Sequence, residues 1–209
     1  MKLFAVASCI GILSFGVANA QEYSKMTADI GGGYTTPVGT AGRYLETGWN
    51  VGAGLGYNFS SHLGAKLDFG YDSLGLNGGA VQALGVPGGQ VHIFQATIDP
   101  VMHLTPASSR LDVYVMGGGG VFHRYQEISG VSSLTGSADV PYLGVFPVSV
   151  GASQVLPNYT VTKPGFDVGA GVAVGAIGRG KFFMEAKWDH MFLNYGHTDY
   201  IPVTFGFRH

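Results

Sequence analysis

The sequence predicts an all-β protein, a transmembrane antiparallel up-and-down β-barrel of eight strands. Three observations predict this fold. Eight segments alternate between apolar and polar or glycine residues with a period of two, the period of a β-strand. Their charged residues lie on the face opposite the large apolar residues. The connections between segments alternate between long and short, as in hairpins that turn on the two sides of a membrane.

Most of the predicted strands reach the nine to eleven residues that a tilted strand needs to cross a bilayer, and the first is marginal. No apolar run beyond the N-terminal segment approaches the length of a transmembrane helix, so a chain embedded in lipid would have to cross as strands. The strands are predicted at residues 27 to 34, 47 to 59, 63 to 76, 90 to 105, 110 to 126, 164 to 177, 181 to 193 and 200 to 209.

The alternation is clearest in WNVGAGLGYNF, residues 49 to 59, where large apolar side chains share one face and glycine and asparagine the other. It recurs in residues 63 to 72 and 182 to 192. A continuous apolar outer band would cause aggregation in water but is stable in contact with lipid hydrocarbon. A soluble ligand-carrying barrel would show the reverse arrangement, with the apolar face inside. The pattern therefore places the charged face in the lumen of a membrane barrel.

The lumen of an eight-stranded barrel is only wide enough for side chains to fill. Charged side chains in so narrow a space are expected to pair, because an unpaired buried charge is costly. Inward acids outnumber inward bases, so some must be protonated, hydrated or close to a rim. The candidates for these ion pairs are Lys66, Asp68, Asp72, Asp112, Arg124, Asp167, Glu185, Lys187, Asp189 and Arg208.

Aromatic side chains near the ends of the strands predict the two interfacial girdles of a membrane barrel. The candidates are Trp49, Tyr57, Phe59, Tyr71, Trp188 and Phe192, with Tyr34 and Tyr200 in addition.

The longer connections are predicted at 35 to 46, 77 to 89, 127 to 163 and 194 to 199, and they would face outward. One short turn lies in GAIGRGKF, residues 175 to 182, which begins like a phosphate-binding loop. A strand follows it instead of a helix, and Phe182 replaces the hydroxyl that would bind Mg²⁺. We therefore expect a tight hairpin at residues 178 to 180. Pro100, within the fourth strand, predicts a β-bulge.

The connection at 127 to 163 is apolar and nearly uncharged. Loops of this length are usually functional or disordered. The interpretation that we favour is an extra hairpin or a lid above the barrel, and a specific receptor surface is the alternative.

The N-terminus predicts a secretory signal peptide over residues 1 to 20, followed by a barrel domain over 21 to 209. Lys2 precedes an apolar run that ends in the cleavage pattern of Ala18 and Ala20. The alternative is a lipoprotein that is cut before Cys9 and lipidated there. Cleavage after Ala20 would remove the single cysteine and exclude disulfides and thiolate chemistry. It would also remove Lys2, changing the formal charge from −2 to −3, which does not favour nucleic-acid binding.

The signal peptide, the eight strands, GGGY at 31 to 34 and the ending YIPVTFGFRH resemble the OmpA-like small outer-membrane β-barrel proteins. The resemblance implies a monomer in the outer membrane of a Gram-negative bacterium, with lipid and lipopolysaccharide around it. It also implies a structural or surface-interaction role in the cell envelope. The barrel-assembly machinery would recognise the last strand, through Phe205, Phe207 and a terminal position that His209 occupies here.

Two other functions stay open at this stage: a lipid-modifying enzyme of the outer leaflet, of the lipid A acylase or deacylase type, and a narrow channel. An enzyme of that kind needs a hydroxyl and a histidine close together near the outer rim. His123 or His197 with Ser129 or Ser132 are the residues that could provide them. Asp189 and His190 are excluded as a pair, because adjacent strand residues point to opposite faces. No metal-binding or cofactor-binding spacing is present in the sequence, and no cofactor is expected.

Overall fold

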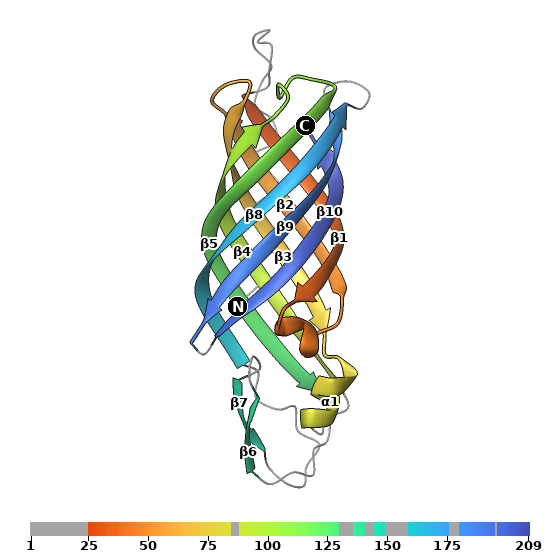
Figure 1. Cartoon of the computed structure of the whole chain (residues 1–209), viewed down its shortest axis with the longest axis vertical. Coiled ribbons are helices and arrows are strands. Elements are labelled where there is room, and N and C mark those ends of the chain that lie inside the picture. Colours follow the sequence, from red (N-terminus) through yellow and green to blue (C-terminus); the bar gives the residue numbers. More distant parts are fainter. Residues whose placement is uncertain are drawn as a thin grey trace, which may run out of the picture.

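The structure, a computed structural model, describes residues 25–84, 88–129, 136–140, 144–148, 159–175, 180–194 and 196–209. Eight antiparallel strands form a closed barrel in which strands that follow one another in the chain pair side by side (Figure 1). β1 pairs with β10 to close it. The predicted fold class is confirmed. The strands are β1 (Met26–Val38), β2 (Gly48–Asn58), β3 (Leu63–Gly75), β4 (Gly88–His103), β5 (Leu111–Ser129), β8 (Tyr159–Gly175), β9 (Lys181–Leu193) and β10 (Gly196–Arg208).

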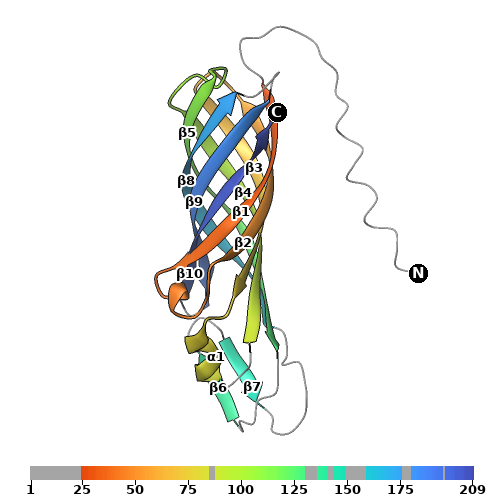
Figure 2. The same cartoon turned by 90° about the vertical axis from the view of Figure 1, so that its right-hand side faces the viewer.

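The two ends of the barrel differ in their connections (Figure 2). At one end, here called the loop end, lie the short helices η1 (Ala41–Arg43) and α1 (Gly78–Leu84) and a separate hairpin of β6 (Gly136–Val140) and β7 (Gly144–Val148). The hairpin is the one predicted within the longest connection. The other end, the turn end, carries the C-terminus. Within the described residues, no helix is long and apolar enough to cross a membrane.

Several strands continue further towards the loop end than predicted. β1 reaches Val38, β8 begins at Tyr159, and β10 begins at Gly196. Polar outward residues such as His197 and Asp199 interrupt the apolar signal there, although the backbone still pairs. The last connection is therefore residues 194–195 alone, so the predicted long loop at 194 to 199 is wrong. The strict alternation of long and short connections fails at this point.

The bulge predicted at Pro100 is also wrong. The register between β3 and β4 is unbroken from Leu63↔Met102 to Gly75↔Gln90, and Pro100 pairs with Ala65. On the β5 side, pairing stops at Ile98↔Gly119 and resumes in the same register at Val101↔Met116. Proline lacks the N–H that would extend this ladder. The barrel therefore accommodates it by losing local pairing without inserting an extra residue.

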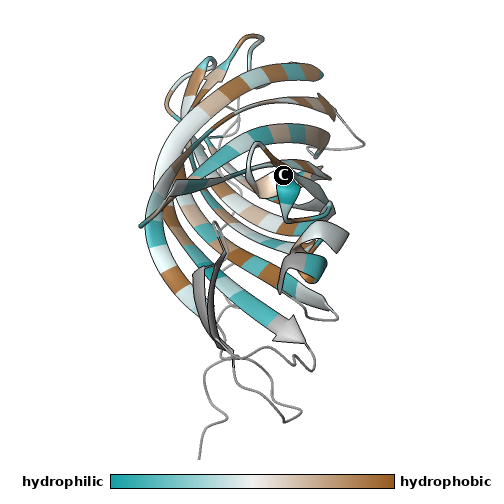
Figure 3. Ribbon diagram, turned by 60° about the horizontal axis from the view of Figure 1, so that its bottom comes forward, coloured by the Kyte–Doolittle hydropathy of each residue, from teal (hydrophilic) through white to brown (hydrophobic). Residues whose placement is uncertain are grey.

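Hydrophobic and hydrophilic residues alternate along the barrel strands (Figure 3), and buried and exposed positions alternate over most of their length. The outer face carries exposed apolar side chains such as Ile30 and Phe182, with 68% and 64% of their surface accessible. The strand residues Asp29, Lys66 and Arg208 are buried inside. The faces predicted from the sequence are the faces in the structure. Arg110 departs from the pattern because it lies before β5 and is exposed.

The seam between β1 and β10 depends on glycine at position 33. A Cβ added to Gly33 would lie 1.9 Å from the carbonyl oxygen of Val203, a backbone atom that has little room to move. We expect Gly33→Ala to destabilise the barrel by about 1–3 kcal/mol, the range for overpacking. The measurement is the temperature at which the unboiled protein loses its folded mobility on a detergent gel.

Gly52→Ala is the matched control, because its Cβ would lie 3.2 Å from the nearest atom, the carbonyl oxygen of Phe69. Equal transition temperatures for the two variants would contradict a steric requirement at the seam.

Candidate functional site

A cluster of buried charges crosses the middle of the lumen around Lys187. Its ammonium nitrogen lies 2.7 Å from a carboxylate oxygen of Asp68, 3.2 Å from one of Asp167 and 3.9 Å from one of Asp99. The Thr97 hydroxyl donates to Asp99 at 3.0 Å, and a backbone N–H donates to Asp167 at 2.9 Å. The four charged residues come from β9, β3, β8 and β4. The cluster therefore links opposite walls of the barrel.

A second cluster, nearer the turn end, is built on Lys66 and Arg208. Lys66 lies 3.2 Å from Asp29, 3.4 Å from Asp68 and 3.5 Å from Glu185. Arg208 lies 3.3 Å from Asp29 and 3.8 Å from Glu185. Two cations thus share two carboxylates, and Asp68 connects this cluster to Lys187.

Tyr114 completes the second cluster. Its hydroxyl donates to Glu185 at 2.9 Å and accepts from Arg208 at 3.0 Å. The Arg208 guanidinium also lies 4.6 Å from the centre of the Tyr114 ring, within cation–π range. The sequence analysis did not select Tyr114, although the alternation places it on the inward face.

Some predicted ion-pair candidates contact uncharged polar side chains. Asp72 accepts from the Thr35 hydroxyl, and Arg124 donates to Gln126 at 3.2 Å. Asp189 is fully buried, and neither of its carboxylate oxygens makes a hydrogen bond within the described residues, although Gln95 approaches it. All three lie in the lumen. The structure brings seven candidates into ion pairs: Lys66, Asp68, Asp112, Asp167, Glu185, Lys187 and Arg208.

A cavity of about 70 Å³ lies at the turn end, next to the second cluster, whose Lys66 and Arg208 contribute to its wall. Its wall includes His103 and Asp112, whose Nδ1 and Oδ1 atoms are 2.7 Å apart. Lys181 lies 3.7 Å from the same carboxylate. The sequence analysis did not select His103 or Lys181 as ion-pair candidates. The period of two places both residues on the inward face of their strands, and this pattern could have identified them.

The lumen near the loop end is filled by an apolar plug. Leu45 and Leu76 belong to two different connections and pair through an isolated β-bridge. Asn77 holds the connections together, because its side chain donates to the Arg43 carbonyl at 2.6 Å. These segments pack onto inward side chains of the strands. The plug comprises Ala41, Leu45, Leu74, Leu76, Ala80, Val91, Ile93, Phe122, Met191 and Tyr200.

Tyr200 is therefore not a girdle residue, and its placement in the girdle is wrong. It is fully buried, and its hydroxyl donates to Gln95 at 2.9 Å. Ile201 and Val203 point outward, so the period of two sends Tyr200 inward.

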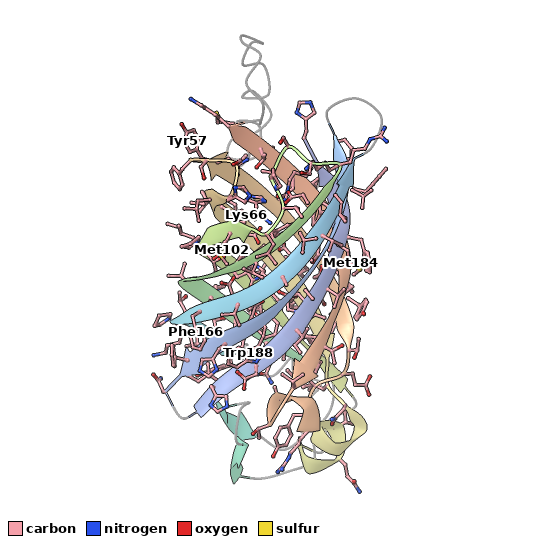
Figure 4. The ribbon with its side chains drawn as sticks, turned by 45° about the horizontal axis from the view of Figure 1, so that its top comes forward. Tyr57, Lys66, Met102, Phe166, Met184 and Trp188 are labelled. Atoms are coloured by element: carbon pink, nitrogen blue, oxygen red, sulfur yellow. The ribbon has the colours of Figure 1, made fainter. Side chains whose placement is uncertain are left out.

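The other aromatic candidates form outward clusters at the two ends (Figure 4). Tyr57 and Phe59 contact each other near the turn end, with ring centres 5.4 Å apart. Near the loop end, Trp49 and Tyr71 lie 5.2 Å apart. Phe166, which the sequence analysis did not select, lies 5.6 Å from Trp188 and 5.9 Å from Phe192. Tyr34 is also exposed.

Four histidines stand among these outward rings at the loop end. Asp199 lies between two of them, 2.6 Å from His190 Nδ1 and 3.2 Å from His197 Nε2. His92 Nδ1 lies 2.8 Å from the Tyr71 hydroxyl, and His123 Nδ1 lies 2.7 Å from the Thr162 hydroxyl. The acid beside His190 is thus Asp199 of the neighbouring strand and not Asp189, which points inward. Within the described residues, no three or more His, Cys, Asp or Glu side chains are arranged so that they could hold a metal ion.

Some predicted residues cannot be placed. Ala18 and Ala20 lie outside the described residues, as do Ser132 and most of the turn at 178 to 180. At the other end of the chain, Phe205 and Phe207 point outward from β10. His209 follows that strand, and its backbone exchanges hydrogen bonds of 2.9 and 2.8 Å with Ala28.

A closed barrel with an apolar outer band, outward aromatic clusters at its two ends and a charged lumen is a transmembrane β-barrel. The chain belongs to the outer membrane protein β-barrel domain family, whose model matches residues 7–207. The protein is located in the outer membrane. Because such barrels have short periplasmic turns and longer outward loops, we expect its loop end to face outward. No curated protein matches the chain.

The solved structures that resemble the fold include the following two. Neisserial surface protein A is 10% identical, the match covers 88% of this chain and 96% of that one, and the TM-score is 0.55. A major outer membrane protein from Thermus thermophilus is 10% identical, with 88% and 98% covered and a TM-score of 0.53. At such low identity, these structures support the shared fold alone.

Proposed function

We propose that this protein is a closed, non-enzymatic barrel with a structural or surface-interaction role in the cell envelope. The observation that carries the proposal is the filled lumen. The apolar plug occupies the half of the lumen nearer the loop end. The charge clusters around Lys187 and Lys66 cross the lumen between the plug and the turn end. A barrel without an open lumen can act through its outer face and its loops. Membership of the outer membrane protein β-barrel domain family is compatible with this role.

The proposal includes the surroundings of the barrel and its route to them. Residues 1–20 would direct export and be removed after Ala20. The barrel-assembly machinery would then engage β10, whose outward Phe205 and Phe207 match the alternating pattern expected of an assembly signal. The mature barrel would stay a monomer, with its outer band in contact with lipid and lipopolysaccharide.

Purified protein in a planar bilayer should give no steady conductance steps. Ions would have to pass both the apolar plug and the charge clusters, and an eight-stranded barrel has no spare diameter. A sixteen-stranded porin, prepared in the same detergent, is the positive control. Heat-modifiable migration on a gel checks that the inserted protein is folded. Reproducible steps from folded protein would replace the proposal with the channel function.

One contact favours the enzymatic alternative. His123 and Thr162 place an imidazole and a hydroxyl together on the outward face, although no carboxylate contacts His123 within the described residues. Under the proposed non-enzymatic role, lipid A from cells that express the protein should keep its acylation pattern. A changed pattern that disappears in His123→Ala or His197→Ala would establish the enzyme in place of the proposed role.

A further inference from the structure

The outward face of the barrel strands carries histidine but neither lysine nor arginine in the described part of the chain. The strand residues Lys66, Lys187 and Arg208 are buried in the lumen, as is Arg124. Lys181 lies on the inward phase of β9, and Lys163 lies on that of β8, where it donates to Asn194. Any cation that this face presents to lipid headgroups must therefore be an imidazolium. The outward histidines of the strands are His92, His123, His190 and His197.

His92 and His123 lie diagonally on neighbouring strands. The register pairs His92 with Tyr125 and Phe94 with His123, so the two histidines are one diagonal step apart on the same face. Such diagonal neighbours are about 7–8 Å apart, within reach of ring side chains. Ring contacts hold both imidazoles: His92 lies 5.8 Å from Tyr71 and 6.1 Å from Tyr125, and His123 lies 6.4 Å from Phe94.

The hydrogen-bond partners decide what the far nitrogen of each ring can do. A hydroxyl can donate to Nδ1, which leaves the proton of a neutral imidazole on Nε2. Tyr71 and Thr162 are such partners for His92 and His123. A carboxylate only accepts, so Asp199 requires the proton on Nδ1 of His190. The first two histidines can thus offer Nε2–H donors while neutral, whereas neutral His190 offers an acceptor.

We propose that His92 and His123 together bind a phosphate group on the glycolipid headgroup of the outer leaflet. The proposal rests on the outer-membrane position and lipid surroundings given under the proposed function. Phosphate accepts hydrogen bonds, and the paired Nε2–H donors complement it. Each histidine lies two residues nearer the loop end than an exposed apolar residue of its strand, Phe94 for His92 and Val121 for His123. The two imidazoles therefore lie at the edge of the apolar outer band, where lipid headgroups are expected.

Protonation should strengthen the site. Imidazole is the side chain that ordinarily gains its charge between pH 8 and pH 5. The ionisable side chains on neighbouring outward positions are Tyr71 on β3 and Tyr125 and Glu127 on β5, and β8 contributes the uncharged Thr162. Glu127 opposes an anion, so positive charge on the two imidazoles should raise the affinity above that of the neutral donors. The pair at His190 and His197 already faces Asp199, which offsets its charge.

The test is a titration of the full-length folded protein, in neutral detergent micelles, with fluorescent bisphosphorylated lipid A at pH 5.5 and pH 8. Wild type should bind roughly tenfold more tightly at the lower pH, about the gain from one charge-assisted hydrogen bond. His92→Gln/His123→Gln should reduce that ratio to about twofold or less. Each single variant should give an intermediate ratio, which keeps the test usable if the double variant folds poorly.

His190→Gln/His197→Gln is the matched control and should keep the wild-type ratio. An unchanged ratio in His92→Gln/His123→Gln would overturn the proposal, as would equal binding of dephosphorylated lipid A. Complete competition by millimolar inorganic phosphate would assign the site to free phosphate instead of lipid. Failure of this binding is distinguishable from failure of the proposed function, which is decided by conductance and by lipid A acylation.

Discussion

Replacing Lys187 with methionine should lower the free energy of unfolding by about 3–5 kcal/mol, the cost of breaking a buried ion pair from one side. In the described part of the chain, Lys187 is the one cation in contact with Asp99 and Asp167. Its loss would leave both carboxylates buried without a cation partner. The measurement is reversible urea unfolding in detergent micelles, followed by tryptophan fluorescence. The expected loss is large enough to reduce the yield of folded barrel as well.

Lys66→Met is the matched control, and it should cost clearly less although Lys66 contacts three carboxylates. Arg208 also contacts Asp29 and Glu185, and Lys187 also contacts Asp68, so each partner of Lys66 keeps a cation. Both lysines are buried, so a difference between the two variants would show whether the carboxylate partners keep another cation, and not the effect of burial alone. An equal or larger loss in Lys66→Met would contradict the division of the lumen charges into one shared cluster and one that depends on a single cation.

Phe122→Ala should also cost about 3–5 kcal/mol, the usual range for truncating a buried phenylalanine. Phe122 is fully buried in the apolar plug, and its ring occupies the space beside Gly165. Alanine would leave a cavity between strands and connections that are tied together at Leu45 and Leu76. Urea unfolding of the variant and of wild type, under identical conditions, gives the difference.

Val121→Ala is the control for that variant, because it removes side-chain volume at the next residue on the opposite face. Val121 is 56% exposed, and lipid or detergent can fill the space that alanine leaves. We expect a loss below about 1 kcal/mol, because exposed substitutions usually have small effects. A larger loss for Val121→Ala than for Phe122→Ala would contradict the assignment of the two faces at this point of β5.

The sequence predicted the barrel because a period of two shows both the strands and their faces. Asp68 and Lys187, which are 119 residues apart in the chain, were both expected in the lumen from this period alone, and they meet there. The partners of each charge could not be predicted, because they depend on the register between strands, which a single sequence specifies only weakly. Asp189 and Asp167 have the same inward phase, yet only Asp167 contacts a lysine within hydrogen-bond distance.

The plug and the histidines illustrate what the sequence pattern does not contain. Leu45 lies in a connection that has no periodic signal, so nothing in the sequence indicated that it would fold into the lumen and pair with Leu76. The contact between His123 and Thr162 spans two strands that are separated by the longest connection. The pairing of β5 with β8 creates this contact, and the hydroxyl partner of His123 could not be inferred before that pairing was known.

The contact between Asp29 and Arg208 has a consequence for the order of events during assembly. These residues are 179 positions apart, and they lie at the seam where the first strand meets the last. Until β10 arrives, β1 has an open edge whose backbone groups would be unpaired in hydrocarbon. Contacts of such long sequence separation form late and slowly. We therefore expect insertion to be completed only when β10 pairs with β1, so that a chain truncated before Gly196 leaves no half-built barrel in the membrane.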